Sequence, residues 1–127
     1  MLATASGEGK VGWITRQDCA KAAAAALAGD FDGKRILDIA GPQALSLAEV
    51  AGILSRVSGK TIASAPLSPA VRKGIFEQLG LPGPVAEILV NSEEGMAQGW
   101  LSTAPGDFES LVGRKAASFA DFARSLV

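Results

Sequence analysis

The sequence predicts an α/β fold with a small, partly parallel sheet, helices packed on it and a mainly helical second half. In residues 1–66, short strand-like segments alternate with helical segments in the order strand, helix, strand, helix, strand. Residues 67–127 carry only helical patterns, and 48% of the chain is hydrophobic. A chain of 127 residues with this composition can bury one core, so we expect a single domain over residues 1–127.

The first strand and the first helix are predicted from the N-terminal segment. Residues 11–14 (Val-Gly-Trp-Ile) contain side chains that suit a pleated surface. Asp18 is placed to cap the helix that follows, because its carboxylate can accept from the free amides of the first turn. Lys21–Ala28 is almost pure alanine, which favours a slender helix that can approach a sheet closely. Gly29 is expected to end this helix in the left-handed conformation.

A second strand, a second helix and a third strand follow. Arg35–Ala40 is strand-like and is broken by a Gly-Pro pair. The motif Ser-Leu-Ala-Glu that begins at Ser46 is a capping box, and the apolar residues after it recur at helical spacing. Gly59 is predicted to close the helix, and Thr61–Ala65 is predicted to form the third strand.

The second half is predicted to hold four helices, each with a recognisable start. Serine, proline or aspartate stands at three of these starts, as expected for helix N-termini. The predicted helices run from Ser68 to Gly80, from about Val85 towards Met96, from Asp107 to Gly113, and from Ser118 to the last residues.

The sequence contains no histidine, no tyrosine and a single cysteine, Cys19. Without histidine, neither a Ser-His-Asp nor a Cys-His nucleophile can be assembled, and a zinc site with the usual nitrogen and sulfur ligands is excluded. One cysteine forms no internal disulfide, and with no histidine partner we expect Cys19 to be buried and inert. We therefore predict no catalytic and no metal-binding residue in this chain.

Charge and hydropathy exclude two classes of partner. Twelve Lys and Arg stand against 13 Asp and Glu, whereas a nucleic-acid binder usually carries a clear basic excess. The longest apolar stretch, Ala22–Ala28, is far shorter than the roughly 20 residues that a membrane helix needs. We expect neither nucleic acid nor membrane as a partner, and the cytoplasm is the default compartment for a chain with one cysteine.

Two glycine-containing segments resemble nucleotide-binding motifs. Gly7–Gly12 spells G-x-G-x-x-G, but that motif needs a buried strand before it and a helix directly after it to hold a pyrophosphate. A strand-like segment follows instead, so we interpret Gly7–Gly12 as a flexible lead-in to that strand. Gly59–Thr61 resembles the end of a P-loop, but it leaves a helix and enters a strand, which is the reverse of a phosphate cradle.

Five segments, in this order and spacing, resemble those of the NmrA-like reductases, a group of atypical short-chain dehydrogenases. The most similar subgroup is that of the NAD(P)H:quinone oxidoreductases. The segments are Trp13–Ala20 with its Arg-x-Asp-x-Ala pattern, Gly41-Pro42 with Ser46–Glu49, the turn Gly59-Lys60, the corner Gly80-Leu81-Pro82, and Leu111–Arg114 with Ser118-Phe119.

The resemblance implies a two-part enzyme of the Rossmann type. Its N-terminal part holds NADP or NAD with a glycine-rich loop, and its smaller C-terminal part covers the nicotinamide and shapes the substrate pocket. The chain matches only the later part, so we expect a substrate-binding domain that lacks the dinucleotide-binding part, binds no cofactor alone and is inactive alone.

The resemblance also implies the partners of this chain. They are the missing Rossmann portion and a quinone-like small molecule. Without the Rossmann portion an apolar face should be exposed, and such patches favour association, so self-association with a second copy of the chain is a hypothesis. The alternative is a non-enzymatic, NmrA-like regulatory module that binds a ligand or a protein and self-associates. A third reading, nucleic-acid binding, has neither a basic excess nor a motif to support it.

Six residues are predicted to bind the substrate. Aromatic and Met side chains offer a flat substrate a large apolar contact, and core packing is the alternative for them. The resemblance places the two polar residues near the cofactor cleft, and a surface salt bridge is their alternative. Arg114 is expected to tie the C-terminal segment to the domain through a carboxylate. The predicted substrate-binding residues are Trp13, Arg16, Gln17, Phe76, Met96 and Trp100.

Overall fold

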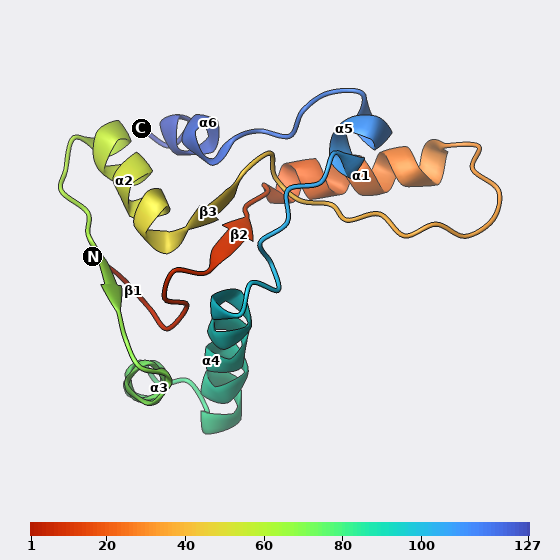
Figure 1. The fold of residues 1–127 in the computed structure, drawn as a ribbon. Helices are drawn as coiled ribbons and strands as arrows, with labels where there is room; N and C mark the ends of the chain where they lie inside the picture. The colour runs from red at the N-terminus through yellow and green to blue at the C-terminus, as the bar shows by residue number, and fades with distance from the viewer.

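The computed structural model describes all residues from Met1 to Val127 and contains four short strands and six helices (Figure 1). The α/β fold class predicted from the sequence is confirmed, and only helices follow the last strand. The strands are β1 (Leu2–Thr4), β2 (Lys10–Gly12), β3 (Ala44–Ser46) and β4 (Ser64–Pro66). The helices are α1 (Arg16–Ala28), α2 (Leu47–Ser58), α3 (Pro69–Gln78), α4 (Gly83–Ala97), α5 (Asp107–Val112) and α6 (Phe119–Arg124).

The strands form two separate pairs, one parallel and one antiparallel. β1 pairs with β4 in parallel, with Leu2 opposite Ser64. β2 pairs with β3 in antiparallel fashion, with Lys10 opposite Ser46. The parallel pair requires a long crossover between its strands, and the chain from β2 to α2 supplies it. The sheet is therefore partly parallel, as predicted, but it is divided into two small units.

The helices pack in pairs around these strands (Figure 1). α1 packs against α5 at one end of the molecule, α2 packs against α6, and α3 packs against α4 at the opposite corner. The pair α1 and α5 shares a small core in which Ala22 and Ala116 contact Phe108, whose exposed fraction is 2%. The alanine face of α1 allows this close approach, because its side chains add little bulk.

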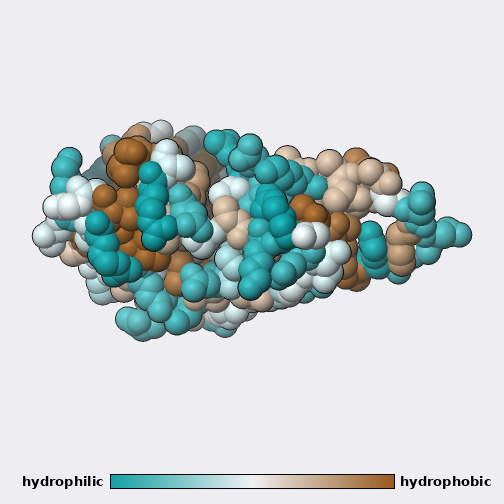
Figure 2. Space-filling model, turned by 90° about the horizontal axis from the view of Figure 1, so that it is seen from above, coloured by the Kyte–Doolittle hydropathy of each residue, from teal (hydrophilic) through white to brown (hydrophobic).

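Much apolar surface lies outside this core. Only 17 of 127 residues are buried, so several large apolar side chains are exposed, among them Ile88 and Trp100. Seen from above, the molecule is elongated, and apolar atoms gather over the end where α2 and α6 lie (Figure 2). An exposed apolar surface of this kind favours association with another surface. None of the helices combines the length and the apolar composition needed to cross a membrane.

The predicted start of the first helix is wrong by three residues. Thr15, and not Asp18, is the N-cap of α1, since the Thr15 hydroxyl accepts from the Asp18 amide at 3.1 Å. Asp18 lies in the first turn, where its carboxylate bonds to distant parts of the chain instead. Gly29 ends α1 as predicted, but in an extended conformation with φ of −80°. The left-handed closure expected there occurs at Gly59, with φ of 67°, at the end of α2.

Two strand predictions also need correction. Arg35–Ala40 forms no strand, because no other segment pairs with it, and Ile36 is 84% exposed. One of its amides, that of Asp38, donates instead to the Asp107 carboxylate at 2.9 Å. The strand of this region is β3, directly before α2. The strand predicted at Thr61–Ala65 begins three residues later, at Ser64.

The G-x-G-x-x-G segment is a tightly packed turn and strand, and not a flexible lead-in. A Cβ atom added at Gly9 would lie 2.1 Å from the Met96 carbonyl oxygen. A Cβ atom at Gly12 would lie 2.1 Å from the Thr103 carbonyl oxygen. These two glycines therefore allow β2 to lie directly against the end of α4 and the segment after it.

Candidate functional site

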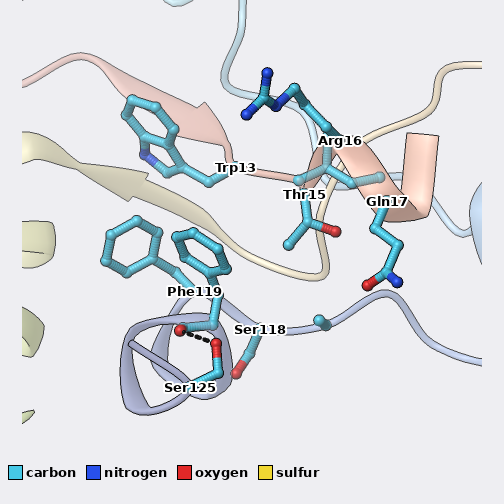
Figure 3. A pocket seen from close by; sticks show the side chains of 10 residues that line it. Trp13, Thr15, Arg16, Gln17, Ser118, Phe119 and Ser125 are labelled. Atoms are coloured by element: carbon cyan, nitrogen blue, oxygen red, sulfur yellow. Dashed lines mark hydrogen bonds between the residues drawn. The ribbon is translucent and has the colours of Figure 1, made fainter. Parts of the chain in front are cut away.

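A cavity of about 530 Å³ lies between two segments that are far apart in the sequence. One wall is residues 13–17, which connect β2 to α1, and the other is residues 117–119 at the start of α6, with Phe122 and Ser125. Figure 3 shows both walls and the space between them. The volume falls in the range of small-molecule sites, roughly 300–1,000 Å³.

Three aromatic rings form the apolar side of this cavity. The ring centroids of Trp13 and Phe119 are 6.2 Å apart, and those of Phe119 and Phe122 are 6.4 Å apart, both edge to face. The indole nitrogen of Trp13 donates to the Leu45 carbonyl of β3 at 3.2 Å, which fixes the orientation of the ring. Such a row of rings offers a flat organic molecule a large contact area with little directional demand.

Two polar side chains of the cavity are free to bind a ligand. Arg16 and Gln17 are exposed, and neither side chain takes part in a hydrogen bond or an ion pair. In Figure 3, Arg16 extends on the side of Trp13, and Gln17 points toward Ser118. The surface salt bridge considered as the alternative for Arg16 is therefore not formed.

The hydroxyl groups of the cavity are already engaged. The Ser118 hydroxyl donates to the Asp121 carboxylate at 2.6 Å and accepts from the Asp121 amide at 3.1 Å. The Ser125 hydroxyl donates to the Phe122 carbonyl at 2.6 Å, the bond drawn in Figure 3. These hydroxyls hold α6 in place and leave recognition of a ligand to Arg16 and Gln17.

An ion pair joins the two walls of the cavity. Arg114 donates to the Asp18 carboxylate at 2.5 Å, and the Ala117 amide donates to the other carboxylate oxygen at 2.8 Å. Burial by itself would raise the pKa of the Asp18 carboxyl, but these bonds outweigh it, and the pKa lies below its ordinary value of 3.8. The prediction that Arg114 ties the C-terminal segment to the domain through a carboxylate is confirmed.

The cavity contains Trp13, Arg16 and Gln17, but not the other three predicted site residues. Phe76 of α3 lies under the Arg72 guanidinium, 4.2 Å from the ring centroid. Met96 is half-buried near the end of α4. Trp100 is 71% exposed, as its position between Gly99 and Leu101 suggested, and it lines a different hollow on α4.

The partners of Trp13 were not predicted from the sequence, and the prediction for Cys19 is wrong. Phe119 and Phe122 line the cavity, although their spacing in the sequence predicts only an apolar helix face. The one available signal was the expected bond of Arg114, which brings the start of α6 to the start of α1. Cys19 was expected to be buried, but it is exposed, because it follows Asp18 on the outer side of the first turn of α1.

No family model matches the sequence, but individual proteins do. The chain is 33% identical over 123 residues to an NAD(P)H azoreductase of Xenophilus azovorans, covering 94% of this chain and 42% of that protein. It is 30% identical over 117 residues to quinone oxidoreductase 2 of Escherichia coli, covering 92% of this chain and 41% of that protein.

Solved structures agree with this similarity. The NADPH complex of the E. coli NADPH-dependent quinone oxidoreductase superposes with a TM-score of 0.92 at 29% identity, covering 98% of this chain and 44% of that one. A triphenylmethane reductase from Citrobacter sp. superposes with a TM-score of 0.89 at 28% identity, covering 99% of this chain and 44% of that one.

Fold and sequence together show what the chain is similar to: its homologues are NAD(P)H-dependent oxidoreductases with Rossmann-type folds. More particularly, the chain corresponds to the C-terminal portion of the NAD(P)H-dependent quinone and azo reductases. It spans less than half the length of these relatives. The resemblance stated from the motifs is confirmed.

Proposed function

We propose that this chain is the substrate-binding portion of an NAD(P)H-dependent reductase that acts on a quinone-like acceptor. The similarity to quinone and azo reductases over more than nine-tenths of the chain carries the proposal. In such a reductase the cofactor supplies the reducing chemistry, and the protein positions the two reactants. The part of this chain is to bind and orient the acceptor.

The glycine segment Gly7–Gly12 does not fit the pyrophosphate of a nicotinamide dinucleotide. A pyrophosphate cradle needs open glycine backbone followed at once by a helix. Gly9 and Gly12 instead lie against the carbonyls of Met96 and Thr103, and β2 follows the turn. We therefore propose that NADP or NAD is held by a Rossmann portion outside these 127 residues, and that the chain alone neither binds the cofactor nor reduces a substrate.

The cavity beside α1 is our proposed place for the acceptor. Its three rings offer apolar contact to a flat ring system, and Trp13 and Phe119 already pack edge to face against each other. Arg16 and Gln17 stand at the rim with unused hydrogen-bond donors, and a quinone oxygen is an acceptor that both can serve. The proposed contacts are Trp13, Arg16, Gln17, Phe119 and Phe122.

A fusion protein tests this proposal. The N-terminal portion of E. coli quinone oxidoreductase 2 is joined to this chain in place of the segment that the chain matches. We expect NADPH-dependent reduction of a soluble quinone by the fusion, and none by the chain alone. A Trp13→Leu variant of the fusion should keep its NADPH affinity and lose quinone turnover. A folded fusion that binds NADPH but reduces no quinone would contradict the proposal.

A further inference from the structure

The proposed acceptor cavity has an unbalanced charge. Of the ten residues that line it, Arg16 is the one charged residue, and none is Asp or Glu. Five of the ten are hydrophobic. A bound molecule therefore meets one cation at the edge of an apolar, ring-lined space.

Nearby carboxylates do not neutralise this cation. Asp18 is two residues away, but its side chain is 4% exposed and both its oxygens are bonded to Arg114 and the Ala117 amide. Asp121 pairs with Arg124 at 2.7 Å and accepts the Ser118 hydroxyl. Each of these anions already has its own cation, so the charge of Arg16 remains available to a ligand.

The guanidinium and the rings together specify a ligand class. A guanidinium recognises a sulfonate or carboxylate with two parallel N–H bonds, and charged hydrogen bonds are about twice as strong as neutral ones. The amide of Gln17, on the Ser118 side of the cavity, can donate to another polar atom of the ligand. The edge-to-face rings of Trp13 and Phe119 suit a flat aromatic body.

We propose that this cavity selects aromatic anions, in which a flat ring system carries a sulfonate or carboxylate group. The ring lies against Trp13, Phe119 and Phe122, and the acid group is bound by Arg16. The inference deepens the proposed function and rests on it for the role of the site: the acceptor of the reductase is an acid-bearing aromatic compound. The anion preference itself is a property of this chain alone.

The test compares two probes that differ in charge and hardly in shape. A naphthalenesulfonate and the matching naphthalenesulfonamide, which is uncharged at neutral pH, are titrated into the 127-residue chain. Two-dimensional NMR gives both affinity and location. We expect amide shifts at residues 13–17 and 117–125, and binding of the sulfonate about tenfold tighter than that of the sulfonamide. This difference should shrink with added salt.

Two variants that each remove one positive charge distinguish binding at the cavity from general electrostatic attraction. Arg16→Gln should bring the sulfonate to the affinity of the sulfonamide, about a tenfold loss, and leave the sulfonamide unchanged. Arg16→Glu should reverse the order of the two probes. Arg56→Gln removes an equal charge from an exposed position that lines another hollow, and it should change neither affinity. The exposed Arg16 side chain forms no hydrogen bond or ion pair within the fold, so these variants should remain folded.

The outcomes are distinct from those of the fusion test. Equal binding of both probes at the cavity, unaffected by Arg16→Gln, would overturn the anion preference and leave the proposed acceptor site in place. An equal loss in Arg16→Gln and Arg56→Gln, or shifts confined to other residues, would also overturn it. If the chain prefers the sulfonate but the fusion reduces no quinone, the anion-binding site stands and the proposed reductase function is rejected.

Discussion

Asp18 and Arg114 are 96 residues apart in the sequence, and their side chains form an ion pair of 2.5 Å between the start of α1 and the segment before α6. The Asp18 side chain is 4% exposed, whereas that of Arg114 is 43% exposed. The pair and the neighbouring bond from the Ala117 amide hold the two walls of the candidate site together. The geometry of the cavity therefore depends on Asp18 and Arg114, which do not line it.

Removing the carboxylate of Asp18 should destabilise the fold. Asp18→Asn loses a charged hydrogen bond from Arg114 and weakens that from Ala117, and we expect a loss of about 2 kcal/mol in the free energy of unfolding. Asp121→Asn is the matched control, because its pair with Arg124 is exposed and screened by solvent, and it should cost much less than Asp18→Asn. Urea unfolding of the two variants measures the difference. Equal losses would show that the Asp18 pair has no special role.

The same pair predicts how stability depends on pH. The pKa of Asp18 in the folded chain lies below 3.8, so the carboxylate stabilises the fold above that pH and its contribution is lost as pH falls through the folded pKa. The pKa of Asp121 is also lowered, chiefly by the Ser118 hydroxyl, so acid affects more than one site. The difference in the free energy of unfolding between the parent chain and Asp18→Asn isolates the contribution of Asp18. This difference should stay constant from about pH 7 to about pH 5 and shrink below about pH 4. A difference that grows in acid would contradict the bonds of the Asp18 carboxylate to Arg114 and the Ala117 amide.

Two glycines should respond to alanine in opposite ways. Gly9→Ala places a Cβ 2.1 Å from the Met96 carbonyl, so β2 and α4 must separate, and a loss of at least about 2 kcal/mol is expected. Gly74→Ala, inside α3, meets nothing within 4 Å and should stabilise the chain by up to about 1 kcal/mol through helix propensity. Thermal unfolding reports both changes. A neutral Gly9→Ala would mean that this contact is not close in solution.

The apolar surface of α4 should make the isolated chain self-associate. Ile88 is 65% exposed and Trp100 is 71% exposed, and both line one hollow with Leu101. Sedimentation velocity over a range of concentrations should show species larger than the monomer. Ile88→Lys should restore the monomer, whereas Leu27→Lys should not, although Leu27 at the end of α1 is 88% exposed. A monomer at every concentration would show that this surface does not mediate self-association.

Local signals in the sequence predicted the helices well and the strands poorly. The capping box at Ser46 fixes the start of α2, and Gly59 fixes its end, because both act on neighbouring backbone groups. Arg35–Ala40 has the composition of a strand, but a strand also needs a partner, and none lies beside it. Pairing is decided by the tertiary fold, which no short segment specifies.

The same limit explains why only three of the six predicted residues line the cavity. Trp13, Arg16 and Gln17 are consecutive or nearly so, and a helix start gathers them without help from the rest of the fold. Phe119 joins them only because Arg114 and Ala117 bind Asp18. Phe76, Met96 and Trp100 share the apolar character of the site residues, but α3, α4 and the turn after α4 carry them to other surfaces.

Titration calorimetry of NADPH into the purified chain tests the central claim most directly, with the fusion to the N-terminal portion of the E. coli enzyme as its positive control. If these 127 residues supply only the substrate side of a reductase, the chain alone gives no binding heat, and the fusion binds NADPH. Tight binding of NADPH by the chain alone would contradict the claim that the cofactor is held outside these residues.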